Sequence, residues 1–164
     1  MQDYRKLDVW TKSHDLALDV HRVTAMRGRG VEAEEGSDGE ASAEAAADIR
    51  AAVRRAALRV PVLIVVGCEA ETAPEFAQAM RDAATAVDEL AYRLRFARDV
   101  GVLEAVPYAK LEARANQLRA MLGALNRTVR FKLGAEVRPA VARAMRAVRD
   151  DGSSRPRSRP RSTS

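Results

Sequence analysis

Histidine and cysteine are the side chains best suited to nucleophilic catalysis or metal binding near neutral pH, and this sequence contains only His14, His21 and Cys68. The histidines are seven residues apart, which on a helix places them about two turns, or roughly 10 Å, apart along the axis. That distance is too large for a shared zinc ion, and a single cysteine cannot complete such a site. We therefore predict no metal site and no cofactor, and we interpret the histidines as core or interface residues.

A catalytic thiol or hydroxyl would need a general base beside it. The two histidines are the natural candidates, but both fall on a segment expected to be a packed helix. Gly28 and Gly30 do not follow a strand, so they do not form a phosphate-binding loop. We therefore predict no catalytic residues and expect that the protein is not an enzyme.

Charge is the remaining feature that could support a function. The net charge is +5, but residues 31–48 contain seven acidic and no basic side chains, so the rest of the chain carries +12. A basic body attracts polyanions, nucleic acid first among them. The alternative is that the arginines only keep exposed helix faces soluble. The candidate nucleic-acid contacts are Arg50, Arg54, Arg55, Arg59, Arg95, Arg98, Arg155, Arg157, Arg159 and Arg161.

The acidic segment at about residues 28–42 contains Gly and Ser and is predicted to be a loop. It is either a solvated linker or a competitor that folds back over the basic surface.

The strongest helical pattern lies between residues 76 and 97. Its apolar residues alternate at spacings of four and three, which is the heptad pattern of a helix packed among other helices. Thr72 and Glu75 form a capping-box pattern before it, and Gly101 supplies a stop. We predict that this seam forms the core or an oligomer contact. Its members are Phe76, Met80, Ala83, Val87, Leu90, Leu94 and Ala97.

The helices before the seam are predicted from the same periodicity. The first covers about residues 8–27, and the second begins near Ala43 and continues through Pro61. The run of residues 60–66 resembles a buried strand by composition, but no second strand is available to pair with it. Helix is therefore the preferred interpretation.

After the seam, a fourth helix is expected from Pro107, with an interruption at Gly134 and a further short helix from about Pro139. The last residues are Ser, Pro and Arg only from Ser153, apart from Thr163, so they are expected to be disordered. The predicted fold is all-α: an antiparallel up-down four-helix bundle over residues 1–134, an accessory helix over 135–150 and a basic tail over 151–164.

Two bulk features bear on location. No run of 18 apolar residues is present, and a single cysteine fits a reducing compartment. We therefore expect a cytoplasmic protein that does not bind membranes.

Four stretches, in this order and spacing, carry a family resemblance: residues 4–10, 54–61 with Gly67, 75–76 with 88–90, and 97–103. Over about residues 4–130 the chain resembles the four-helix-bundle proteins encoded in intervening sequences of bacterial 23S rRNA genes. The resemblance implies a left-handed up-down bundle, a ring-like homopentamer and no enzymatic activity. A related protein, the accessory variability determinant of diversity-generating retroelements, engages nucleic acid and a reverse transcriptase through a basic surface. The resemblance therefore implies self-association, RNA or DNA, and a reverse transcriptase as partners.

The chain departs from this family where Val62-Leu-Ile-Val-Val-Gly67 replaces the usual Ser-Asn-Ile-Ala-Glu-Gly. Large apolar residues thus stand where polar ones are expected, so these positions do not support nucleic-acid binding. Five consecutive apolar residues on a helix point in every direction, and at least one would face water in a lone bundle. We predict that this run is covered in the assembled protein by a stripe of the final helix, from the same chain or from a neighbour, formed by Val141, Met145 and Val148.

Overall fold

The computed structural model describes the backbone of residues 3–26 and 37–151 and the side chains of residues 3–25 and 42–131. The described residues form helices and contain no strand, so the all-α fold is confirmed. The chain divides into two compact units, residues 1–129 and 130–164. The elements are a 3-10 helix η1 (Tyr4–Lys6), α1 (Asp8–Met26), α2 (Ser37–Cys68), α3 (Ala73–Asp99) and α4 (Ala105–Asp151).

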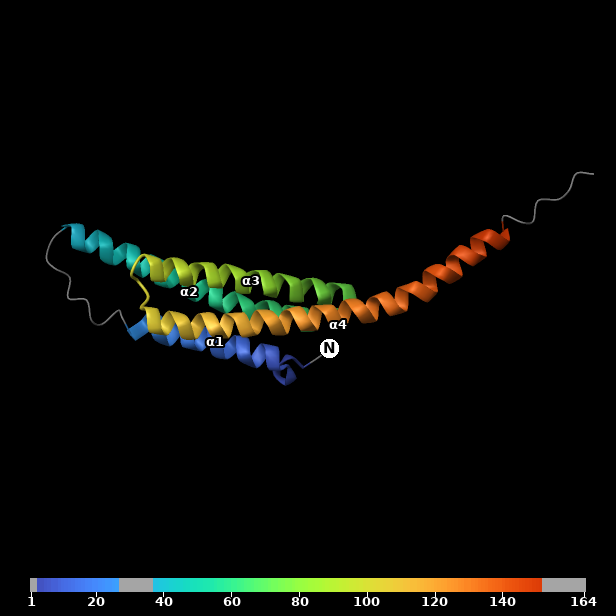
Figure 1. Cartoon of the computed structure of the whole chain (residues 1–164), viewed down its shortest axis with the longest axis horizontal. Helices are drawn as coiled ribbons and strands as arrows, with labels where there is room; N and C mark the ends of the chain where they lie inside the picture. Colours follow the sequence, from blue (N-terminus) through green and yellow to red (C-terminus); the bar gives the residue numbers. More distant parts are fainter. Residues whose placement is uncertain (1–2, 27–36, 152–164) are drawn as a thin grey trace, which may run out of the picture. The chain divides into compact units, whose positions relative to one another are not determined.

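Within the first unit, successive helices run in alternate directions (Figure 1). For α2 and α3, the contacts between the two helices show the antiparallel direction directly. Gly67, at the end of α2, approaches Met80 near the start of α3, whereas Arg59 reaches Glu89 farther from the connection. The predicted up-down bundle is therefore the architecture of this unit.

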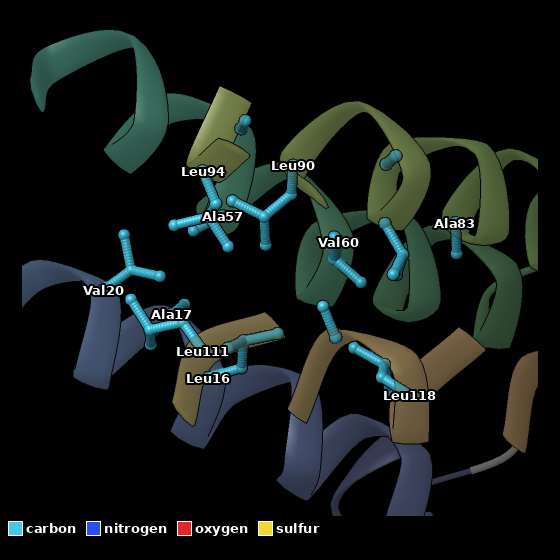
Figure 2. Close-up of a cluster of buried hydrophobic side chains, with 14 of the residues drawn as sticks. Leu16, Ala17, Val20, Ala57, Val60, Ala83, Leu90, Leu94, Leu111 and Leu118 are labelled. Carbon is cyan, nitrogen blue, oxygen red and sulfur yellow. The ribbon is translucent and has the colours of Figure 1, made fainter. Parts of the chain in front are cut away.

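The predicted seam of α3 lies at the centre of the bundle. Met80, Val87, Leu90 and Leu94 are 0% exposed, and Phe76 is partly buried against them. Figure 2 shows side chains of all four helices converging on this region. The predicted capping box is also present, with the Thr72 hydroxyl accepting from the Glu75 backbone N–H and the Glu75 carboxylate accepting from that of Thr72. The seam residues hold the core of a single chain.

Small residues explain how one chain can cover the seam of this helix. A Cβ atom on Gly67 would lie 2.6 Å from Met80 Cε and 2.9 Å from Ala79 Cβ, so α2 and α3 approach closely there. Ala77 and Ala86 are also buried. Alanine and glycine therefore let the neighbouring helices of one chain crowd against the seam, and self-association stays a prediction.

Helix α2 begins at Ser37, earlier than the predicted start near Ala43. Alanine is the strongest helix former, and Ala45, Ala46 and Ala47 favour extension of the helix toward the N-terminus. The predicted acidic loop over residues 28–42 is thus too long, and its part before residue 37 lies outside the described residues. Pro61 lies inside α2, so residues 60–66 are helical, as predicted, and not a strand.

Helix α4 continues through Gly134 and Pro139 to Asp151. The predicted interruption and separate short helix are therefore wrong. Inside a helix, glycine costs only about 1 kcal/mol and proline about 3 kcal/mol relative to alanine, and the surrounding residues are mostly strong helix formers. The predicted tail lies beyond the described residues.

Among the helices that the structure describes, none combines the length and apolar character needed to cross a membrane.

Candidate nucleic-acid interface

The arginines predicted to form one basic surface on α2 lie on different sides of that helix. Arg54 lines a hollow against α1, whereas Arg59 donates to Glu89 Oε2 of α3 at 2.8 Å. Arg55 is exposed and forms no ion pair with any described residue. Because successive residues of a helix are separated by about 100°, neighbouring arginines cannot share one face. The structure therefore divides the predicted patch in two.

On the α3 side, the arginines share carboxylates. Glu89 accepts from Arg59 and, at 2.7 Å, from Arg93 of its own helix. Such exposed pairs contribute only about 0–1 kcal/mol, so a phosphate can compete for either arginine. Two arginines on one carboxylate leave a net positive charge.

The predicted pair at the end of α3 is engaged locally. Arg98 Nε donates to Asp99 Oδ1 at 2.8 Å, and its guanidinium lies 4.4 Å from the centre of the Tyr108 ring. Arg95 Nε is 3.9 Å from Asp99 Oδ2. These contacts make Arg95 and Arg98 weaker candidates than the unpaired arginines of α2.

The α1 side of α2 contains a hollow of about 190 Å³. Both histidines line this hollow, and both are exposed. Their interpretation as core residues is therefore wrong for the single chain, and an interface role stays a prediction. They lie on α1 outside the buried stripe formed by Val9, Leu16 and Val20. The hollow is lined by His14, Ala17, Leu18, His21, Arg54 and Leu58.

An aromatic stack continues this surface along α1. The rings of Trp10 and His14 are nearly parallel, with centres 5.2 Å apart, and Tyr4 meets Trp10 edge-on at 4.9 Å. The Arg5 guanidinium lies 5.5 Å from the Tyr4 ring centre. Aromatic rings with nearby arginines are the groups that stack unpaired bases and hold their phosphates. Our sequence interpretation missed this stack, although the spacing of four between Trp10 and His14 was a signal for it.

Asp19 of α1 is directed away from this surface. It forms ion pairs with Arg22 of its own helix and with Arg114 of α4. A carboxylate that would otherwise oppose a phosphate is thereby held on the α4 side of the bundle.

A second hollow, of about 300 Å³, lies between α2 and α3. Tyr92 is 69% exposed and Phe96 is 45% exposed at its edge. Glu44 and Asp48 are exposed near the start of the described part of α2, so this end of the helix is less suited to phosphate. The sequence interpretation missed this hollow as well. It is lined by Ile49, Ala52, Val53, Tyr92, Arg93 and Phe96.

The C-terminal half of α2 exposes apolar residues. Leu58, Val62 and Val66, here called the α2 stripe, are 60%, 57% and 56% exposed, while Ile64 between them is fully buried. The expectation that part of residues 62–66 would face water in a lone bundle is confirmed. The predicted cover, formed by Val141, Met145 and Val148, lies outside the described side chains.

Cys68 is buried, and burial is the largest cause that raises the pKa of its thiol, followed by the charge of Glu69. A buried thiol with a raised pKa is a poor nucleophile. The described side chains contain no group of three His, Cys, Asp or Glu residues able to hold a metal ion. Arg155, Arg157, Arg159 and Arg161 lie outside the described residues.

Residues 39–124, more than half of the chain, match the model of a family described as 23S rRNA-intervening sequence protein. No curated protein matches the chain. The matched region runs from the start of α2 into α4, so it includes the α2 arginines and the α2 stripe but not α1.

Proposed function

The chain belongs to the 23S rRNA-intervening sequence protein family, and from this premise we propose that it is a non-enzymatic, homo-oligomeric accessory protein that binds RNA or DNA. The family resemblance favours a pentamer. The binding surface is the α1–α2 face, where Arg54 lines the hollow and Arg5 lies beside the aromatic stack.

The observation that carries this proposal is a set of unpaired arginines on α2, of which Arg54 lies on the α1–α2 face. Arg50, Arg54 and Arg55 form no ion pair within the described part of the chain. Arg54 lies in the hollow, and its Nε donates to the Arg50 backbone carbonyl at 3.3 Å. Three guanidinium groups within two turns can neutralise phosphates without first breaking a salt bridge.

The surface supports binding without base-specific recognition. Arginines on a helix flank neutralise phosphates, and the ring of Trp10 stacked on His14 offers a platform beside them. No feature of the described surface is shaped to read base edges in a groove. We expect affinity that depends little on sequence and falls by orders of magnitude between about 50 and 200 mM salt as counterions are released.

Fluorescence anisotropy with labelled single-stranded RNA and DNA tests this proposal. The variant Arg50→Glu/Arg54→Glu/Arg55→Glu should lose binding at low salt. A control with the same change in charge is Arg81→Glu/Lys110→Glu/Arg127→Glu, at exposed positions on α3 and α4. The control should weaken binding far less, because it leaves the α1–α2 face intact.

Equal losses in the two variants would show that binding follows net charge and not this face. No binding by the unaltered protein at low salt would reject a nucleic-acid role. Far-ultraviolet circular dichroism of both variants identifies any loss caused by unfolding.

The absence of enzymatic activity is part of the proposal. The thiol of Cys68 is buried and its pKa is raised, which supports a non-enzymatic role. A nucleophilic cysteine needs a lowered pKa and access to substrate. Exposed His14 and His21 then serve as surface groups beside the arginines.

A second function is favoured by the α2 stripe, which is suited to protein contacts. A structural or protein-interaction scaffold without nucleic-acid binding would use this exposed apolar surface alone. The anisotropy experiment separates the two functions. A reverse transcriptase as protein partner stays a prediction of the family resemblance.

A further inference from the structure

The hollow between α2 and α3 is a second candidate site on the bundle, and all of its lining residues belong to the first unit. Its volume of about 300 Å³ is at the lower end of the range of small-molecule pockets, about 300 to 1,000 Å³. The α2 wall is apolar, because Val53 is buried and Ile49 and Ala52 are partly buried. The function proposed above does not use this hollow.

Two aromatic rings of α3 form the opposite wall. Tyr92 and Phe96 are four residues apart, so they lie on neighbouring turns of one helix face. Both are exposed, whereas Met80, Leu90 and Leu94 of the same helix are fully buried. Exposed rings beside an apolar wall are suited to a flat aromatic ligand, because it can stack on them.

A cluster of charged side chains lies at one end of the hollow. Arg93 lines the hollow and contacts Glu89 Oε1 at 2.7 Å, and Arg59 of α2 contacts Glu89 Oε2 at 2.8 Å. Each contact uses one nitrogen of a guanidinium group that has five N–H donors, so other donors are left for a ligand. Two positive charges and one negative charge leave a net charge of +1, which attracts an anion.

The other end of the hollow is acidic. Glu44 and Asp48 are exposed and precede Ile49 on α2. Asp48 and Arg59 are eleven residues apart, which corresponds to about 16 Å along the helix axis. This difference in charge directs an anionic group of a ligand toward Arg59 and Arg93.

We propose that this hollow binds one unpaired nucleotide of a single-stranded RNA or DNA. The base lies against Tyr92 and Phe96, and its phosphate is bound by Arg59 and Arg93. A nucleotide fits because it joins a flat aromatic base to an anionic group. The inference rests on the proposed nucleic-acid binding and adds a site that takes single strands, since a paired base would first have to be flipped out of its duplex at an energetic cost.

Exposed arginines connect this hollow with the α1–α2 face. By helical register, Arg55 lies about 100° from Arg54 and about 40° from Arg59 around α2. Arg55 is exposed and forms no ion pair with any described residue. One strand can therefore reach both surfaces by crossing α2 at Arg55.

Comparison of an oligothymidylate with an abasic DNA strand of the same length tests the site. The abasic strand keeps the phosphates but has no bases. In fluorescence anisotropy, Tyr92→Leu/Phe96→Leu should bind the oligothymidylate about 5- to 150-fold more weakly than the unaltered protein, which corresponds to the loss of one stacked base. Its binding to the abasic strand should be nearly unchanged, because the arginines and the Trp10 platform are intact.

Phe131→Leu is the matched control, because Phe131 is an exposed ring on α4 outside the hollow. It should bind both strands as the unaltered protein does. Tyr92→Phe keeps both rings of the hollow, so it should recover the affinity that leucine loses. Arg59→Gln/Arg93→Gln should weaken binding to both strands and reduce the slope of log affinity against log salt by about 1–2.

An equal loss on both strands by Tyr92→Leu/Phe96→Leu, or no loss on either, would overturn the proposal. An unchanged salt slope for Arg59→Gln/Arg93→Gln would overturn the phosphate contact. Displacement of the strand by micromolar thymidine monophosphate would assign the hollow to a free nucleotide in place of a strand.

Two further results separate the levels of failure. A change of mass in light scattering for Tyr92→Leu/Phe96→Leu, with binding retained, would assign the hollow to contacts between chains and overturn only this site. Failure of the unaltered protein to bind either strand at about 50 mM salt would reject the proposed nucleic-acid role as well.

Discussion

The seam of α3 and the α2 stripe are both rows of large apolar side chains, yet their surroundings are opposite. The seam residues Met80, Leu90 and Leu94 are fully buried, whereas Val62 and Val66 of the stripe are more than half exposed. Their spacing differs in a way that matters. Alternating steps of four and three keep a row on one face of a helix, whereas repeated steps of four turn it by about 40° each time.

The comparison shows that burial depends on whether neighbouring helices follow a row along its whole length. The α3 seam faces the other helices at every turn, so one chain covers it (Figure 2). The α2 stripe crosses the outer surface of the same bundle, where no other helix of the first unit covers it. We infer that the seam determines the fold and that the stripe is available for association.

The largest expected effect is on the seam. Leu90→Asp places a carboxylate at a fully buried position with no partner, which costs several kcal/mol, comparable with the whole stability of a small domain. We expect an unfolded or aggregated protein by circular dichroism and thermal melting. Tyr92→Asp, two residues away but 69% exposed, is the control and should fold normally. Cooperative melting of Leu90→Asp near the temperature of the unaltered protein would contradict the position of the seam.

The close approach of α2 to α3 can be tested with two glycines. Gly67→Ala puts a methyl group against Met80 and Ala79, so it should lower the free energy of unfolding by about 1–3 kcal/mol. Gly123→Ala in α4 meets only Arg127, at an ordinary distance of 3.6 Å, and should stabilise the protein by about 0.5–1 kcal/mol. Urea denaturation measures both. A neutral or stabilising Gly67→Ala would show that the helices are not as close as described.

The α2 stripe should respond in the opposite way to the seam. Val62→Asp changes a side chain that is 57% exposed, so the unfolding free energy of the single bundle should change by no more than about 0.5 kcal/mol. The mass in solution should nevertheless fall, because a carboxylate would disrupt the exposed apolar surface that is suited to contacts between chains. An unchanged oligomer would exclude the stripe from the interface.

The smallest effect concerns Cys68, which lies at the end of α2. Burial raises the pKa of this thiol in the folded state above its value in the unfolded chain. The stability that the protonated thiol contributes is complete below the unfolded-state pKa and is lost as the pH rises through the folded-state pKa. Stability should therefore decline slightly in the alkaline range, and less so for Cys68→Ser. Alkylation by iodoacetamide should be slow until the protein is unfolded. Rapid alkylation of the folded protein would contradict the burial.

Much of the fold could be predicted from the sequence because its signals are local. The heptad spacing around Leu90, the capping box at Thr72 and the stop at Gly101, which has a φ of +77°, each depend on a few neighbouring residues. The continuity of α4 through Pro139 could not be predicted in this way, because one breaker competes with a long run of helix formers.

The surface was harder to predict because it depends on how helices are rotated against one another. Arg54 and Arg59 lie on opposite sides of α2, and only the packing of α1 and α3 shows which of them is paired. The stack of Trp10 on His14 lies within α1, so its spacing of four was readable, but the hollow that it adjoins forms only where α1 packs beside α2.

Size-exclusion chromatography with light scattering, recording absorbance at 260 and 280 nm, tests the central claim most directly. Our account predicts a particle of several chains of 17.9 kDa, a pentamer by family resemblance, that carries nucleic acid at low salt and releases it at high salt. A nucleic-acid-free particle with the mass of a single chain at micromolar concentration would contradict it.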